Sequence, residues 1–286
     1  MSDIYTIIRR KDNQIIWQDG QQEKIIELYN QGKSLAEICN IFNIKAPETI
    51  RRVLKKNGVK VVGFRNKFPL NENYFENIDS NEKAYWLGML YADGNISNYD
   101  NEVALSLKDK EHVEKFKEAI GAINHHIIHI VDNRWKSKCH IYKVYFKCSK
   151  LKQDLIKWGC IPNKSQQIVS IPNIKQEYFS HFIRGYFDGD GSIHIGNKNN
   201  YRISFVGTYD FLKEIQHVLN VSTKIVQNGG TNNKSFVFQV MGNQQIYHIM
   251  NYLYTDATYS TVLIRKYNKY QDLCSVLGAS PLNLEI

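Results

Sequence analysis

The chain has 286 residues, of which 43% are hydrophobic and 23% are charged, and its formal net charge is +9. A chain of this length and apolar content can bury a sizeable core, which excludes wholesale disorder. No run of 18 apolar residues is present, which excludes a transmembrane helix, and the N-terminal residues lack the apolar segment of a signal peptide. We therefore expect an intracellular, cytoplasmic protein with no membrane partner.

The cysteines argue against a disulfide framework or a thiolate zinc site, and the charge indicates the kind of partner. Five cysteines are scattered without a Cys-x-x-Cys pair, so neither a disulfide framework nor a thiolate zinc site is indicated. The basic excess is concentrated, because residues 45–67 hold eight lysines and arginines against one acid. This clustering predicts a polyanionic partner, and the alternative is a basic protein with solvated charged faces.

Residues 1–58 are predicted to form an N-terminal arm followed by three short helices. From Gln21 onward, apolar residues recur at helical spacing. Ser34 and Glu37 then form a capping box at the start of a second helix, and Pro47 begins the third helix. The outer face of the third helix is basic and consists of Arg51, Arg52, Lys55 and Lys56. This pattern resembles the helix-turn-helix domains of resolvases and phage regulators, whose last helix enters the major groove. The alternative is a three-helix packing module that binds nothing.

Residues 59–80 show little periodicity and are predicted to form a linker. Phe64 and Phe68 can pin this linker to a surface. Arg65 and Lys67 are expected to follow a DNA backbone.

An internal repeat fills the rest of the chain. The segments 84–94 and 181–191 match each other, and a similar order of strands and helices follows each one. Two copies imply two halves, 81–175 and 176–286, each with the order helix, strand, strand, helix, strand, strand, helix. We therefore predict an α+β fold of two pseudo-symmetric halves, each with a four-stranded antiparallel sheet, preceded by a small all-α helix-turn-helix domain.

Each copy of the repeat has a glycine inside an apolar helix and an Asp-Gly pair at its end. The internal glycines, Gly88 and Gly185, cost about 1 kcal/mol each relative to alanine, which predicts that the two helices cross closely. Helix pairing then brings Asp93 and Asp190 together, and two close carboxylates favour a cation between them. Hard oxygen ligands suit Mg²⁺, with Mn²⁺ as a substitute. The glycine after each aspartate is expected to permit a sharp exit into a strand. The expected metal-binding positions are Asp93, Gly94, Asp190 and Gly191.

The segments Trp86–Gly94 and Ile183–Gly191 resemble the motif of LAGLIDADG homing endonucleases of the monomeric, two-motif type. The first copy has Tyr91 at the sixth position, where the family usually has aspartate, and the second copy has Asp188. The resemblance implies that the two sheets form a saddle on double-stranded DNA. It also implies a metal-dependent, site-specific endonuclease active in intron homing, which hydrolyses phosphodiesters on both strands and leaves short 3′ overhangs.

The same resemblance implies a basic residue beside the scissile phosphate in each half. Lys164 and Lys266 are the candidates, and each is expected to stabilise charge on the phosphate or to orient the attacking water. The alternative for each is a plain phosphate contact or a solvated lysine. His125, His126 and His129 lie in a predicted strand without suitably spaced ligands, so packing or phosphate contact is expected there rather than a metal site.

Alternate side chains of the strands are expected to face DNA. The strand 140–148 and its counterparts in the second half supply polar residues between inward apolar ones, and the loop 132–138 is expected to contact phosphate. The candidate contacts are Arg134, Lys136, Lys138, Lys143, Tyr145, Lys147, Arg202, Ser204 and Gln239.

Two other functions remain open from the sequence. A catalytically silent DNA-binding regulator would keep the two sheets and the helix-turn-helix. An RNA maturase would instead bind intron RNA and assist splicing. Retention of both aspartates favours the nuclease over the regulator, and the helix-turn-helix favours duplex DNA over RNA.

Overall fold

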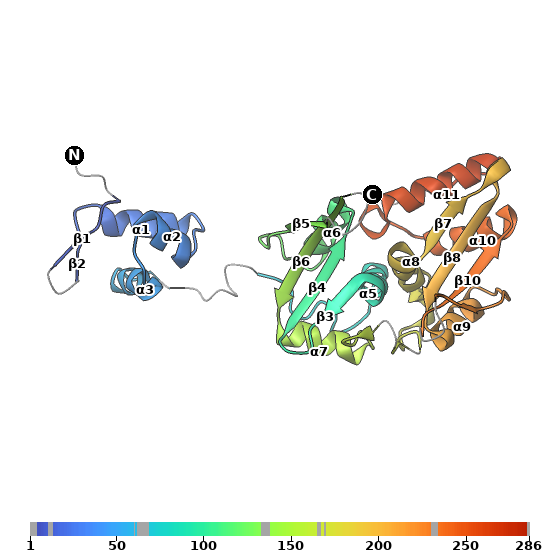
Figure 1. Cartoon of the computed structure of the whole chain (residues 1–286), viewed down its shortest axis with the longest axis horizontal. Helices are drawn as coiled ribbons and strands as arrows, with labels where there is room; N and C mark the ends of the chain where they lie inside the picture. The colour runs from blue at the N-terminus through green and yellow to red at the C-terminus, as the bar shows by residue number, and fades with distance from the viewer. Residues whose placement is uncertain are drawn as a thin grey trace. The chain divides into compact units, whose positions relative to one another are not determined.

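The computed structural model describes residues 5–10, 14–59, 61, 69–132, 138–164, 167–168, 170–229 and 234–284. The chain divides into two compact units, Met1–Pro69 and Leu70–Ile286 (Figure 1). Among the described residues, no helix is both long enough and apolar enough to cross a membrane.

The N-terminal unit contains the three predicted helices and a short β-hairpin. The hairpin pairs β1 (Ile8–Arg9) with β2 (Ile15–Ile16), and the helices are α1 (Gln21–Asn30), α2 (Leu35–Ile41) and α3 (Pro47–Lys56). The capping box is confirmed, since the Ser34 hydroxyl accepts from the Glu37 amide at 3.1 Å and the Glu37 carboxylate accepts from the Ser34 amide at 2.7 Å. The prediction of an all-α unit was wrong, because the hairpin places Ile15 and neighbouring apolar residues against the helical core.

The second unit has the predicted repeat of elements. The first half comprises α5 (Asn81–Asp93), β3 (Gly94–Ile96), β4 (Glu102–Leu107), α6 (Lys110–Ala119), β5 (Ile128–Asp132), β6 (Cys139–Lys147) and α7 (Ser149–Lys157). The second half comprises α8 (Phe179–Asp190), β7 (Ser192–Ile195), β8 (Tyr201–Gly207), α9 (Tyr209–Val218), β9 (Val226–Gln227), β10 (Phe236–Met241) and α10 (Asn243–Tyr254), followed by α11 (Ile264–Leu277). The α+β prediction is therefore confirmed.

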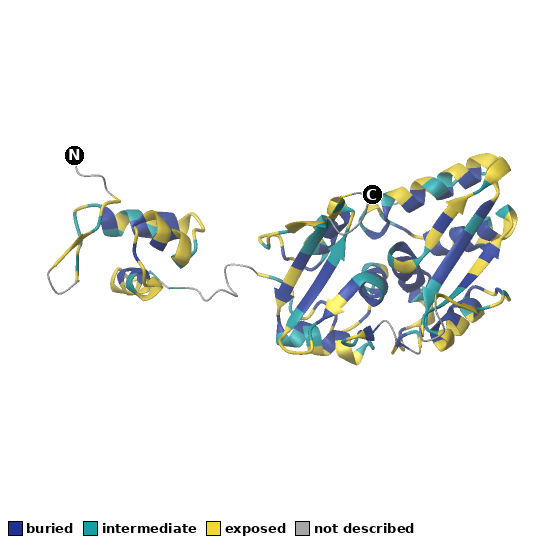
Figure 2. Ribbon diagram, in the orientation of Figure 1, coloured by how far each residue is buried: buried dark blue, intermediate teal, exposed yellow. Residues whose placement is uncertain are grey.

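The two sheets have equivalent topologies. Their strand orders are β3-β4-β6-β5 and β7-β8-β10-β9, and every pairing is antiparallel. The helices α5 and α8 lie side by side between the sheets and are buried over most of their length (Figures 1 and 2). One face of each sheet packs on helices, and the opposite face remains open.

The close crossing of α5 and α8 is confirmed. A Cβ atom added to Gly88 would lie 2.0 Å from the Phe182 carbonyl oxygen, and one added to Gly185 would lie 2.0 Å from the Tyr85 carbonyl oxygen. In both cases the obstacle is backbone, which cannot move aside as a flexible side chain can. Glycine at these two positions therefore sets the distance between the helices, and with it the separation of their C-terminal ends.

Candidate active site

The two motif aspartates lie at the ends of the paired helices. Asp93 is the last residue of α5 and Asp190 is the last residue of α8. The sharp exit into a strand is present, since β3 begins at Gly94 and β7 at Ser192, but the two glycines have ordinary φ angles of −69° and −84° and do not supply a left-handed conformation. They provide space instead, because a Cβ on Gly94 would lie 2.5 Å from the Leu90 carbonyl oxygen. A Cβ on Gly191 would lie 2.1 Å from the Phe187 ring, so neither turn admits a side chain.

The two carboxylates influence each other electrostatically. The last turn of α8 packs against Asp93, since a Cβ on Gly189 would lie 2.8 Å from an Asp93 carboxylate oxygen. Burial and the neighbouring charge of Asp190 raise the pKa of Asp93 to about 6. Burial also raises the pKa of Asp190, although its side chain reaches the surface. The contribution of Asp190 to the shift of the Asp93 pKa shows that the two carboxylates repel each other when both are ionised.

The two candidate lysines lie beside these acids, as predicted. Lys164 and Lys266 are buried, and their charges oppose the upward pKa shifts of both aspartates. The Lys164 ammonium donates to the Ala92 carbonyl at 2.7 Å. Each lysine is thus bound to the end of the helix that carries its own half's aspartate.

The Lys266 ammonium is fully engaged by backbone. It donates to the carbonyls of Asp188 at 2.8 Å and Gly191 at 2.6 Å, and also to that of Phe187. An ammonium has three donors, so no N–H remains for a phosphate in this conformation. Burial lowers the pKa of Lys266 to about 8. The Asp188 carbonyl lies in the last turn of α8, where acceptors lack helical partners, whereas the Phe187 carbonyl also accepts from the Gly191 amide at 2.9 Å. Lys266 therefore stabilises that helix end.

Two residues of this site were not predicted. The Tyr186 hydroxyl donates to the Val206 carbonyl at 2.6 Å and also interacts with the Asp190 carboxylate. Arg265 contributes positive charge at Asp93 while it forms an ion pair with Asp109 at 3.1 Å. The available signal for Tyr186 was a hydroxyl four residues before Asp190, one helical turn away in the same motif. No local signal points to Arg265, because its proximity to Asp93 arises only from the tertiary fold.

The oxygen donors of the site fit a hard divalent cation. Across the described ranges, no group of three or more His, Cys, Asp and Glu side chains is placed to hold a metal. A cation at Asp93 and Asp190 would therefore complete its coordination with backbone oxygens, water or phosphate oxygens, as Mg²⁺ commonly does. A cation bound between the two acids would lower their raised pKa values, because it stabilises the ionised carboxylates. Of the two candidate glycines, Gly94 pairs with Leu105 in the sheet and the Gly191 carbonyl already accepts from Lys266.

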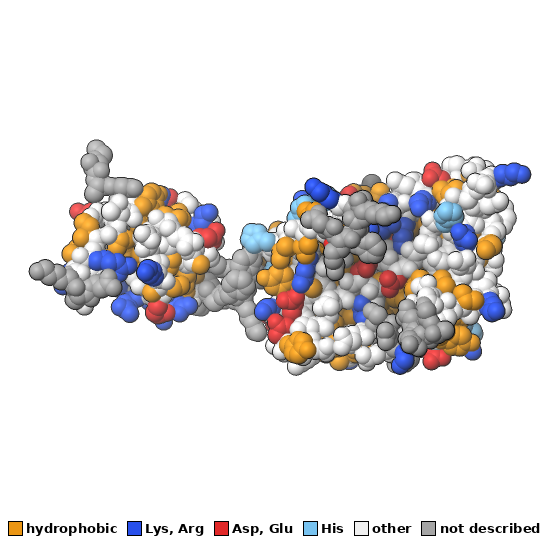
Figure 3. Space-filling model, viewed as in Figure 1, with side chains coloured by type: hydrophobic (Ala, Val, Ile, Leu, Met, Phe, Trp, Pro, Cys, Tyr) orange, Lys and Arg blue, Asp and Glu red, His pale blue; other side chains and the backbone are white. Residues whose placement is uncertain are grey.

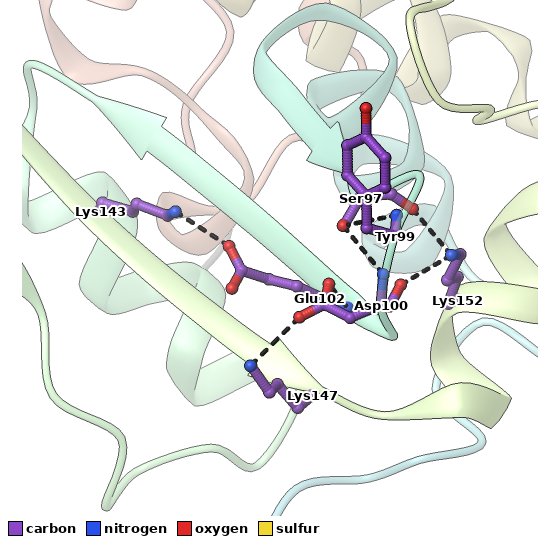
Figure 4. Close-up of polar contacts among 7 residues, drawn as sticks. All are labelled: Ser97, Tyr99, Asp100, Glu102, Lys143, Lys147 and Lys152. Atoms are coloured by element: carbon purple, nitrogen blue, oxygen red, sulfur yellow. Dashed lines mark hydrogen bonds and ion pairs between the residues drawn. The ribbon is translucent and has the colours of Figure 1, made fainter.

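The open face of the first sheet presents the predicted side chains of β6. Tyr145 and Lys147 are exposed and Lys143 is half-buried, while Val144 and Phe146 are buried on the opposite face. Both lysines are paired with acids (Figure 4), Lys143 with Glu102 at 3.0 Å and Lys147 with Asp100 at 3.1 Å. Their positive charge is thus partly neutralised in the free protein, which the sequence did not reveal.

The loop between β3 and β4 is fastened beside this face (Figure 4). The Lys152 ammonium donates to the carbonyls of Ser97 and Asp100, each at 2.7 Å. The Ser97 hydroxyl accepts from the amides of Tyr99 and Asp100, each at 3.2 Å. Tyr99 itself is fully exposed at the loop tip.

The second sheet places Arg202, Ser204 and Gln239 on its open face. Gln239 is the direct cross-strand partner of Ser204, and Arg202 lies opposite Met241. Gln239 is exposed, whereas Ser204 is buried and shares a hydrogen bond of 2.7 Å with the Ser192 hydroxyl. Ser204 is therefore a poor candidate for direct contact with a base.

The remaining candidates are divided between exposed and undescribed positions. Lys138 is exposed at the start of β6. Arg65, Lys67, Arg134 and Lys136 lie outside the described residues. Of the three histidines, His129 lies in β5, where its ring stacks on Tyr142 with centroids 4.9 Å apart, whereas His125 and His126 precede that strand.

The predicted basic face of α3 is present. Arg51, Arg52, Lys55 and Lys56 are all exposed, and Arg51 forms an ion pair with Glu48 at 2.6 Å. Basic side chains are visible on the surface of the N-terminal unit in Figure 3. The three helices are thus placed as the sequence indicates, while their use in DNA binding stays a prediction.

Comparison with known proteins identifies the second half. Residues 177–267 match the model of the LAGLIDADG-like domain family. An uncharacterized protein of Methanocaldococcus jannaschii is 27% identical over 160 residues, or 55% of this chain and 59% of that protein. The chain thus spans less than two thirds of that relative.

Several solved structures are similar at low identity. The homing endonuclease I-WcaI bound to its DNA recognition sequence is 14% identical, with a TM-score of 0.47, covering 81% of this chain and 99% of that one. The meganuclease I-SmaMI bound to uncleaveable DNA is 14% identical, with a TM-score of 0.43, covering 68% and 89% respectively. Full-length DUF199/WhiA from Thermatoga maritima is 13% identical, with a TM-score of 0.44, covering 73% and 64% respectively.

Proposed function

We propose that this chain, in which residues 177–267 form a LAGLIDADG-like domain, is a metal-dependent, site-specific endonuclease of double-stranded DNA. The observation that carries the proposal is the pairing of Asp93 and Asp190 at the ends of two closely crossing helices. The repeat gives the site two similar halves, which suits a duplex whose two strands are related by approximate two-fold symmetry. Cleavage of both strands with short 3′ overhangs is the outcome that the motif resemblance implies.

The proposed chemistry is hydrolysis, in which water attacks phosphorus and one P–O ester bond breaks. A divalent cation held by the two carboxylates would neutralise negative charge and activate water for attack. Asp93 and Asp190 bind that cation in their ionised form. Lys164 and Lys266 hold the helix ends by their hydrogen bonds to backbone, and their positive charge favours a phosphate nearby.

Duplex DNA as the substrate is supported by charge and by shape. The net charge of +9 and the exposed basic face of α3 favour a polyanion. The open faces of the two sheets present side chains that can meet base edges, such as Gln239 and Lys147. Electrostatic attraction provides affinity, whereas the sheet faces provide sequence discrimination.

One observation favours a second candidate, a DNA-binding regulator without nuclease activity. All three Lys266 donors are already used by backbone carbonyls, and Lys164 is likewise buried and bonded. A regulator would retain these lysines as structural anchors and would need no metal. The two carboxylates, whose raised pKa values a cation would reverse, favour the nuclease.

A selection experiment tests the proposal. Duplexes bound by the full chain are selected from a random pool, exposed to Mg²⁺, and the ends of any products are sequenced. Staggered cuts at one long motif support the endonuclease and reveal its target. Tight specific binding without cutting in Mg²⁺ or Mn²⁺ would favour the regulator, and weak duplex binding with strong intron RNA binding would favour the maturase.

A further inference from the structure

We infer that Tyr85 and Asp188 are positioning residues for Asp190, and that the two strands are consequently cut at unequal rates. This inference rests on the proposed nuclease function. It arises from a buried network around Asp188, which takes in Tyr85 and His112 from the first half. The network joins the interface between the two halves to the helix end that carries Asp190.

The centre of the network is the Asp188 carboxylate, which is 1% exposed. One of its oxygens accepts from the Tyr85 hydroxyl at 2.8 Å and from the Leu263 amide at 2.9 Å. Its other oxygen is buried without a hydrogen-bond partner among the described residues. A carboxylate in this setting depends strongly on the donors it has, because each unmet polar atom is costly in a protein interior.

With the Asp188 carboxylate ionised, the protons of the network have one consistent arrangement. The Tyr85 hydroxyl lies 2.8 Å from His112 Nε2 and has a single proton, which it donates to Asp188. It must therefore accept from His112, which places the histidine proton on Nε2. Burial lowers the pKa of His112 to about 3, which keeps the ring neutral and Nδ1 unprotonated. The chain of donors thus runs from α6 through α5 to α8, across the interface of the two halves.

Asp188 is coupled to Asp190 through the start of α11. Leu263, whose amide binds the Asp188 carboxylate, directly precedes this helix, and Lys266 lies in its first turn. Lys266 returns to α8 and binds the carbonyls on either side of Asp190, those of Asp188 and Gly191. Loss of the Tyr85 donor would weaken the hold on the Asp188 carboxylate and, through its bond to the Leu263 amide, would make the start of α11 more mobile. The hydrogen bonds from Lys266 to the backbone around Asp190 would weaken in turn.

Among the described residues of the first half, nothing corresponds to the Asp188 carboxylate and its donors. The corresponding motif position is Tyr91, whose hydroxyl donates away from the site to the Trp158 carbonyl. Its lysine, Lys164, makes one backbone hydrogen bond at the Asp93 turn, where Lys266 makes three at the Asp190 turn. The two aspartates are therefore held with different rigidity, although the fold around them is pseudo-symmetric.

The test uses a duplex labelled at both ends, so that each strand is followed separately in single-turnover reactions. The variant Tyr85→Phe removes the donor to Asp188 and, with the same oxygen atom, the acceptor for His112 Nε2. The matched control is Tyr254→Phe, because the Tyr254 hydroxyl is buried near Asp188 but has no hydrogen-bond partner among the described residues. Both variants make the same chemical change in the same core.

The expected result is that Tyr85→Phe slows one strand about tenfold more than the other, so that nicked duplex accumulates, while Tyr254→Phe retains the wild-type ratio. Equal slowing of both strands by Tyr85→Phe, or no slowing, would overturn the inference. A general loss of stability would affect both strands alike and would also appear in the thermal midpoint.

A second readout keeps the inference testable if the wild-type chain does not cut DNA, which would refute the proposed function alone. Amide hydrogen exchange is then measured over residues 259–267. Tyr85→Phe is expected to raise exchange there about tenfold over wild type, and Tyr254→Phe is expected to leave it unchanged. Unchanged exchange in Tyr85→Phe would show that the network does not hold the start of α11.

Discussion

The substitution Gly88→Ala tests the helix crossing on which the paired-acid site depends. A methyl group at this position would lie 2.0 Å from the Phe182 carbonyl oxygen and 2.9 Å from the Tyr186 amide nitrogen. Helix propensity alone would favour alanine by about 1 kcal/mol. Overpacking costs about 1–3 kcal/mol where side chains can adjust, and backbone on both sides places this case at or above the upper end. We expect a net destabilisation of at least about 2 kcal/mol.

The assay is thermal unfolding followed by circular dichroism. For a domain of about 200 residues, 2 kcal/mol corresponds to a fall in Tm of about 4–8 °C. The control is Gly196→Ala, where the new Cβ would lie 3.4 Å from the Asn200 carbonyl oxygen and φ is −90°. An unchanged or higher Tm for Gly88→Ala, with the control also unchanged, would refute the close packing of α5 on α8.

Three further outcomes follow from the site and its surroundings. The pKa of Asp93 is raised to about 6 in the folded protein, so the protonated carboxyl stabilises the fold fully below its unfolded pKa, and this stability is lost as pH rises through about 6. A cation can replace the lost proton. Mg²⁺ is therefore expected to raise Tm at pH 7.5 and to have little effect at pH 5. Arg52→Gln is expected to reduce the slope of the logarithm of the DNA-binding constant against the logarithm of salt concentration by about 1. Arg51→Gln is expected to reduce it by less, because Arg51 is paired with Glu48. Equal slopes for wild type and both variants would contradict phosphate contact by α3. Lys152→Met removes the two donors that fasten the β3–β4 loop, so faster amide exchange is expected over residues 97–101 with a small change in Tm; protected amides there would show that the loop holds without this lysine.

The paired helices and the repeat of elements were predictable because their causes are local. Glycine inside an apolar helix indicates close packing wherever it occurs, and the matching segments around Gly88 and Gly185 identify the partner. The capping box of Ser34 and Glu37 is likewise a pattern of neighbouring residues. The placement of Lys164 and Lys266 beside the acids was predicted only by resemblance.

The features that were missed depend on contacts between distant residues. The ion pair of Lys143 with Glu102 is not given even by strand register, which places Glu102 opposite Lys147, and the Tyr85 to Asp188 hydrogen bond joins residues of different halves. Gly94 was expected for the sharp exit from α5 into a strand, and the structure adds a steric reason, because a Cβ there would lie 2.5 Å from the Leu90 carbonyl oxygen. Pattern alone cannot separate these two reasons, because both select the same residue.

In the proposed nuclease, Asp93 and Asp190 hold the cation that drives phosphodiester hydrolysis. The most direct measurement is single-turnover cleavage of the selected duplex in Mg²⁺ by wild type, Asp93→Asn and Asp190→Asn. The control is Asp210→Asn, the same change at an exposed position in the first turn of α9. We predict that each motif variant still binds the duplex but cuts it at least about a hundredfold more slowly, while the control cuts at the wild-type rate. Cleavage by both motif variants at the wild-type rate would contradict the account.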